Sequence, residues 1–236
     1  MPLVKNEDKK LVNINRRKSA KRFTLRVCQN TGKINLTIPV ESSLRSAENF
    51  VEKNAKWISS QLKQVIPREY VSLGKSIPIE GIKRVIVPKE KSLTGNMLQK
   101  KHLYLECDEF NVGAVTKRFL LDHASATLIP IFQENAQYIK EKIKSIQFKD
   151  TKSRWGSCSS EGSLMINWRL IMAPPSVYRY VIVHEISHLR HMNHGTEFWK
   201  LVNKLHPFYL NDQSWLRRNG RSLKRFVFDV SKEDAA

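Results

Sequence analysis

The amino-acid sequence predicts an α+β fold, with short strands in a basic N-terminal region and long helices in the C-terminal region. Apolar and polar residues alternate in short runs bounded by Gly and Pro up to about residue 110. From residue 112 the apolar residues recur every three or four positions over longer stretches. We therefore expect two regions. Residues 1–110 are basic and β-rich with one amphipathic helix, and residues 111–236 contain the candidate site.

Composition and charge limit the classes of protein to consider. Of 236 residues, 41% are apolar, and 41 Lys and Arg stand against 22 Asp and Glu, a net charge of +19. This composition excludes disorder of the whole chain. The charge favours polyanionic partners, and residues 1–26 and 217–225 concentrate it on a basic surface that is a candidate for nucleic-acid binding. For residues 217–225 the pattern favours a solvated basic patch over a phosphate-binding surface. We find no run of about 20 apolar residues and no secretory signal, so we expect a cytoplasmic protein without membrane contact.

The N-terminal region begins with a predicted hairpin, in which alternating segments flank the turn QNTG between residues 22 and 39. Residues 43–64 carry apolar side chains at helical spacing and predict an amphipathic helix that packs on the hairpin. Short strands then recur between residues 70 and 110. In the C-terminal region, residues 112–144 predict a long helix that Pro130 kinks or breaks. Strands follow at 145–148 and 163–170, and a helix starts at Pro174 and Pro175.

That last helix contains the pattern His184-Glu185-x-x-His188. Two imidazoles one helical turn apart can share one Zn²⁺, and the Glu between them reaches a water molecule as general base. The alternative is a pair of satisfied core histidines with a surface Glu. A buried, unpaired Glu would be costly without a metal, and this favours the metal site.

A catalytic zinc needs a third protein ligand, and His191 and His194 lie just downstream. His191 is seven residues beyond His184, about 10.5 Å along a straight helix, which is too far for one ion. Asn193 tolerates the left-handed conformation that ends helices, so the chain can turn back and bring His194 to the metal. We therefore predict His194 as the third ligand, with His191 as a last-turn residue favoured by the helix dipole.

The sequence resembles the YgjP-like family of zinc metallopeptidases in the combination R-W-G-S-C, H-E-x-x-H and N-H-x-x-x-F-W. Its H-G-x-x-F segment is also similar to SprT-type peptidases. The resemblance implies a zincin-like α+β fold, in which a small twisted sheet lies against the metal helix. It also implies one zinc per chain, bound by His184, His188 and His194, and Glu185 as acid and base. The segment 163–170 would be an edge strand that receives an extended peptide.

Four further residues are candidates for substrate binding. Arg154 and Trp155 lie in a Gly-containing turn ahead of the strand at 163–170, although Trp155 can equally fill the core. Asn167 and Arg169 alternate with apolar residues on that strand, and Arg169 can hold an anion or an oxyanion.

These observations predict a zinc-dependent hydrolase that acts on peptides or proteins. One alternative is a metal-dependent nucleoside triphosphate pyrophosphatase, converting for example UTP to UMP and diphosphate. The high positive charge favours it, because Lys and Arg neutralise phosphates. The other alternative is a nucleic-acid-binding module with structural zinc. The presence of Glu185 disfavours it, because a structural site needs no general base.

Overall fold

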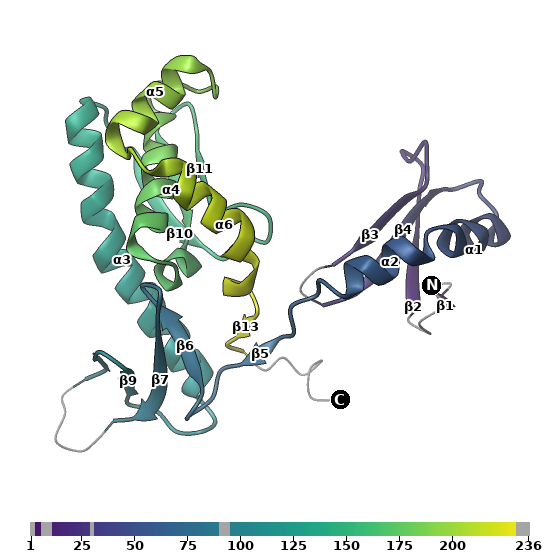
Figure 1. Cartoon of the computed structure of the whole chain (residues 1–236), viewed down its shortest axis with the longest axis horizontal. Helices are drawn as coiled ribbons and strands as arrows, with labels where there is room; N and C mark the ends of the chain where they lie inside the picture. The colour runs from purple at the N-terminus through teal and green to yellow at the C-terminus, as the bar shows by residue number, and fades with distance from the viewer. Residues whose placement is uncertain (1–2, 6–10, 29–30, 90–94, 230–236) are drawn as a thin grey trace. The chain divides into compact units, whose positions relative to one another are not determined.

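The computed structural model describes residues 3–5, 11–28, 31–89 and 95–229. The chain divides into two compact units, Met1–Arg68 and Glu69–Ala236 (Figure 1). Both units combine helices with small sheets, so the predicted α+β class is confirmed.

The N-terminal unit consists of a four-stranded sheet and two helices. Strand order is β1-β2-β4-β3, in which β4 runs parallel to β2 while β1 and β3 are antiparallel to their neighbours. The elements are β1 (Leu3–Lys5), β2 (Leu11–Arg17), β3 (Thr24–Val27), β4 (Ile34–Pro39), α1 (Leu44–Lys53) and α2 (Ala55–Leu62). One face of the sheet packs against the helices, with Val12, Ile14, Ile34, Leu36 and Ile38 on the strands and Ala47, Val51 and Ile58 on the helices.

The predicted hairpin is present as β3 and β4, where Leu25 pairs with Leu36. Gly32 takes a left-handed conformation in its turn, with φ of 67°. The predicted helix over residues 43–64 is instead two helices that meet at Asn54. The Asn54 side chain donates a hydrogen bond to the Phe50 carbonyl at 2.7 Å. Asn competes in this way with the regular helical bonding of the backbone.

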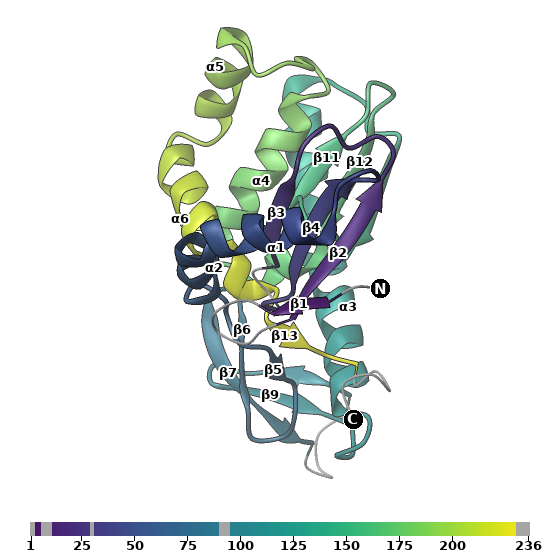
Figure 2. The same ribbon diagram turned by 90° about the vertical axis from the view of Figure 1, so that its right-hand side faces the viewer.

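The C-terminal unit contains three small sheets and the remaining helices. The strand orders are β6-β7-β9-β8, β10-β12-β11 and β13-β5. The strands are β5 (Glu69–Tyr70), β6 (Ser76–Ile79), β7 (Ile82–Pro88), β8 (Met97–Leu98), β9 (His102–Leu105), β10 (Ser145–Lys149), β11 (Gly156–Cys158), β12 (Ser163–Asn167) and β13 (Phe226–Val227). The helices are α3 (Val112–Ile139), the short 3₁₀ helix η1 (Trp168–Met172), α4 (Pro175–Ser187), α5 (Thr196–Leu205) and α6 (Tyr209–Leu223). Helix α4 contacts α3, α5, α6 and β11 (Figures 1 and 2).

The division of the structure at residues 68 and 69 differs from the expected one after residue 110. Apolar side chains of β6, β7 and β9 pack into the same core as α3 and α4, so these strands belong to the C-terminal unit. Alternation in the sequence indicates which residues of a strand are buried, but not which element buries them.

Two further expectations for the C-terminal unit need correction. Pro130 does not break α3, which continues through it as a single helix. The segment 163–170 is not an edge strand, because β12 lies between β10, which is parallel to it, and β11, which is antiparallel. β12 also ends at Asn167, whose side-chain oxygen accepts a hydrogen bond from the Arg169 backbone N–H at 3.0 Å and starts η1.

Among the described residues, none of the helices combines the length and the apolar character needed to cross a membrane.

The left-handed residue at the C-terminus of α3 can be tested by substitution. Lys140 ends this helix in the left-handed conformation, with φ of 58°. Gly adopts this conformation without the steric cost that a side chain carries. Lys140→Gly should therefore raise the free energy of unfolding by roughly 0.5–1 kcal/mol, measured by urea denaturation. Glu134→Gly, at an exposed position inside the same helix, should lower it by about 1 kcal/mol. A loss of stability in Lys140→Gly would contradict the account.

Candidate metal centre

Helix α4 and the turn after it bring three imidazoles together. His184 lies in the last turn of α4, His188 is its C-terminal cap, and His194 precedes α5. Each of the three can offer a ligand atom, and these atoms lie within 4.8 Å of one another. The Nε2 atoms of His184 and His194 are 3.0 Å apart. His191 does not belong to this group, so the geometry favours His194. The reason differs from the expected one: α4 ends at Ser187, before His191, and Asn193 does not adopt the left-handed conformation, which among the described non-glycine residues occurs at Glu80 and Lys140.

The three histidines fit a tetrahedral metal ion. Two nitrogens bound to one zinc at ~2.0–2.1 Å are separated by about 3.3–3.4 Å, close to the spacing of the His184 and His194 nitrogens. His188 Nδ1 donates to the His191 carbonyl at 3.0 Å, which orients the ring and leaves Nε2 for a metal. Burial, together with His188 and His194, lowers the pKa of His184 to about 4, and burial lowers the pKa of His188. These two imidazoles are therefore neutral near pH 7, which is the form that binds metals.

Aromatic residues of α5 support the three imidazoles. The Phe198 ring centroid lies 5.0, 4.6 and 4.7 Å from the rings of His184, His188 and His194. Trp199 lies 5.8 Å from both His184 and His194. Phe198 is fully buried, as expected for the core face of this helix. Its contact with the histidines was not predicted from the sequence, although Phe198 follows His194 by four residues.

Glu185 points its carboxyl group against β11. It is 7% exposed, and burial raises its pKa to about 7 against the opposing charge of Arg154. A Cβ atom at Gly156 would lie 2.4 Å from Glu185 Oε1 and 2.6 Å from its Cδ. Only glycine leaves room for the carboxyl group at this position. This role of Gly156 was not predicted, because a glycine in a turn-rich segment is typical of a turn residue.

Strand β11 is an edge strand beside Glu185. The Trp155 carbonyl accepts from Asn167 N–H, and Ser159 N–H donates to the Ser163 carbonyl. Hydrogen-bonded and non-hydrogen-bonded pairs alternate in antiparallel strands. The backbone N–H and C=O of Ser157 therefore point toward β12, and those of Gly156 and Cys158 point to the opposite side. No strand of the described part of the chain pairs with that side.

Of the four candidate substrate residues, Asn167, Trp155 and Arg169 have structural contacts instead. Asn167 is fully buried and donates to the Thr151 carbonyl at 3.0 Å. Trp155 packs against α6, with Lys224 Nζ 4.4 Å from its ring centroid. Arg154 is exposed, and its charge acts on Glu185.

Arg169 departs most clearly from its expected role. Its Nε and Nη2 atoms donate to the two carboxylate oxygens of Asp150, both at 2.9 Å. Its Nη1 atom donates to the Leu223 and Phe226 carbonyls at 3.2 and 3.0 Å. These bonds tie the end of α6 and β13 to the core, and they leave little donor capacity for a substrate anion.

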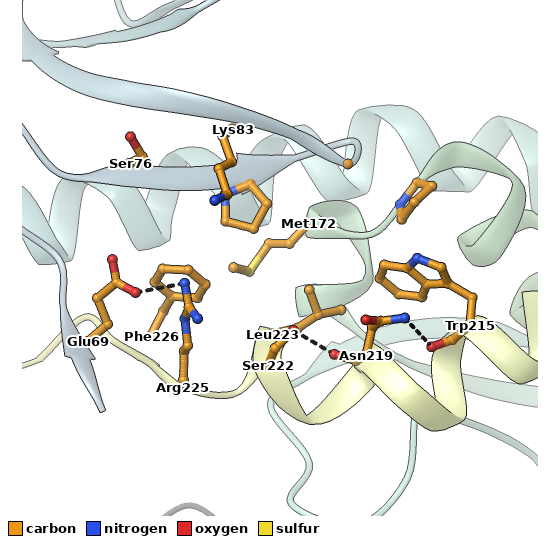
Figure 3. A pocket seen from close by; sticks show the side chains of 13 residues that line it. Glu69, Ser76, Lys83, Met172, Trp215, Asn219, Ser222, Leu223, Arg225 and Phe226 are labelled. Carbon is orange, nitrogen blue, oxygen red and sulfur yellow. Dashed lines mark hydrogen bonds and ion pairs between the residues drawn. The ribbon is translucent and has the colours of Figure 1, made fainter. Parts of the chain in front are cut away.

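A separate cavity of about 430 Å³ lies beyond the N-terminal end of α4 (Figure 3). Met172, Leu223 and Phe226 form apolar parts of its lining, and Glu69 forms an ion pair there with Arg225 at 2.8 Å. None of the three clustered histidines lines it.

Metal analysis of histidine variants tests this site. His184→Ala, His188→Ala and His194→Ala should each lose the bound metal, measured by elemental analysis of purified protein. His191→Ala is the matched control, because His191 contributes only its main-chain carbonyl and should keep the metal. Loss of metal from His191→Ala together with its retention in His194→Ala would refute the assignment.

Comparison with known proteins identifies the family of this chain. Among solved structures, the crystal structure of the metallopeptidase zymogen of Pyrococcus abyssi abylysin is similar, with 16% identity and a TM-score of 0.35. The likeness covers 42% of this chain and 96% of that chain, and it is too low to support an argument. No curated protein sequence matches the chain. The model of the YgjP-like metallopeptidase domain matches residues 21–219, and the chain therefore belongs to the YgjP-like metallopeptidase family.

Proposed function

We propose that the protein is a zinc-dependent peptidase, with His184, His188 and His194 as ligands of one zinc ion and Glu185 as general base. The observation that carries the proposal is the meeting of three groups at one end of α4: the histidine cluster, the buried Glu185 and the edge strand β11. A structural metal site would need only the first of these groups.

The chain's own residues would divide the chemical work. When bound, zinc supplies Lewis acidity toward a water molecule and a carbonyl group. Glu185 takes the proton from the water as it attacks the peptide carbonyl, and then gives it to the leaving amine. Gly156 keeps the Glu185 carboxyl group in position, because its missing side chain leaves the only room for it. Phe198 and Trp199 keep the imidazole rings in place and exclude water from behind them.

Strand β11 supports a peptide substrate. An extended peptide can add to this edge and bond to the backbone groups of Gly156 and Cys158. Such a peptide would pass next to Glu185. A nucleoside triphosphate would instead need several cations beside the metal. Arg154 is the cation whose charge acts on Glu185. We therefore rank peptides first and triphosphates second, and one assay panel can test both.

Replacement of the general base tests the mechanism. Glu185→Gln should keep the fold and the metal, because the side chain at this position is not a ligand in the proposal. Its kcat should fall by ~10²–10⁴-fold with a much smaller change in KM. Unfolded polypeptides and nucleoside triphosphates should be assayed with zinc-loaded and chelated protein. A fully active Gln variant with full zinc would mean that another group is the base.

Gly156→Ala tests the positioning of Glu185. The added methyl group would collide with the carboxyl group, and a displacement of about 1 Å can cost 10²-fold in rate. We expect kcat to fall by about that factor while the zinc content is unchanged. Ser157→Ala on the same strand is the control, because strand alternation directs that side chain to the other face. Equal activity of Gly156→Ala and Ser157→Ala would remove Gly156 from the account.

A further inference from the structure

The N-terminal unit carries an unusual excess of positive charge. Its 68 residues include 15 Lys and Arg and only 5 Asp and Glu, a net charge of +10. The excess concentrates in residues 11–40, which contain no acidic residue. The seven cations of this segment are Arg16, Arg17, Lys18, Lys21, Arg22, Arg26 and Lys33. The segment holds strands β2, β3 and β4, so these three strands and the β2–β3 connection are cationic.

The acidic residues of this unit within the described part of the chain lie elsewhere, whereas Glu7 and Asp8 lie outside the described residues. Glu48 and Glu52 belong to α1, and Glu41 precedes that helix. All three are exposed, and α1 also carries Arg45 and Lys53. The charges of α1 are thus nearly balanced, whereas those of the strands are not.

The outer face of the sheet is the face opposite α1 and α2. Its side chains lie in rows that cross β3, β4 and β2, and the two central rows are polar on these strands. Strand pairing places Arg26, Asn35 and Asn13 side by side in one row. The same pairing places Thr24, Thr37 and Asn15 in the next row. The alternating residues of these strands face the helices and form the core. On β2, β3 and β4 the outer face therefore offers hydrogen-bonding groups beside positive charge, and on these three strands the two rows contain neither an aromatic nor a large apolar side chain.

The cations of this segment are available to a partner. Arg16 donates to the carbonyls of Val40 and Ser42. The other six are exposed, and none of them forms an ion pair within the part of the chain that the structure describes. Arg17, Lys18, Lys21 and Arg22 cluster where β2 ends and β3 begins, and Arg26 lies on the outer face. So many unpaired like charges repel one another, and a polyanion would relieve this repulsion.

We propose that the outer face of this sheet, with the β2–β3 connection, binds duplex nucleic acid through its phosphate backbone. The six residues of β4 extend for about 20 Å, which is long enough to face several phosphates at one charge per ~1.7 Å of duplex axis. The rows of β2, β3 and β4 argue against a membrane surface, since on these strands they have no apolar side chains to insert into lipid, and Leu11 is a single exposed apolar residue at the start of β2. They also lack the aromatic side chains on which the bases of a single strand stack.

The test compares two charge-matched variants of the full-length chain. Lys21→Gln, Arg22→Gln and Arg26→Gln are combined in one variant. The control combines Arg217→Gln, Arg218→Gln and Arg221→Gln, which remove three exposed charges from α6. Binding to a labelled 30-base-pair duplex of arbitrary sequence is measured between about 50 and 300 mM salt. Circular dichroism verifies that both variants are folded.

We expect the sheet variant to bind about 10²-fold more weakly near 0.1 M salt, with a slope of log K against log salt reduced by about 2.7, or 0.9 for each lost contact. The α6 variant should bind nearly as well as the unaltered protein. An equal or larger loss in the α6 variant would overturn the proposal. So would an absence of binding at 50 mM salt, or tighter binding to phosphatidylserine vesicles than to the duplex. None of these readouts depends on peptidase activity.

Discussion

Burial of the ionisable side chains of α4 is the constraint on which the C-terminal unit depends. Glu185 and His188 are almost completely buried, and His184 is surrounded by the rings of Tyr180, Phe198 and Trp199. Taking such groups out of water is costly unless they gain a partner. The neutral imidazoles would gain it from a shared metal ion, for which their ligand atoms lie close enough together. The pKa of Glu185 rises to about 7 because the carboxyl group stays in a desolvated space.

The packing around α4 follows from this constraint. At the start of the helix, Asp212 of α6 accepts a hydrogen bond from Ser176 at 2.8 Å and lies 2.6 Å from His206 Nε2. These contacts fix α6 and the end of α5 on α4. At the other end, the turn after His188 returns the chain so that His194 and α5 close over the imidazoles. On the side of Glu185 the sheet approaches closely through Gly156, which keeps an unpaired strand edge next to the carboxyl group.

Local patterns in the sequence predicted what local chemistry determines. The start of α4 at Pro175 and the spacing of His184 and His188 depend on neighbouring residues, and the structure brings these two histidines together. Relations between distant segments were not predictable in this way. The alternation of residues 163–170 indicates a strand but not that β11 covers its edge. The sequence around Arg169 also does not indicate that its guanidinium donates hydrogen bonds to Asp150 and to the Phe226 carbonyl.

X-ray absorption spectroscopy at the zinc edge of the zinc-loaded full chain would test the central claim most directly, because it reports the ligands without a substrate. The account predicts three imidazole nitrogens and one further oxygen, all at about 2.0–2.2 Å. A sulfur neighbour at about 2.3 Å would bring a cysteine into the first shell and contradict the three-histidine centre. A spectrum fitted by two imidazoles or fewer would contradict it as well.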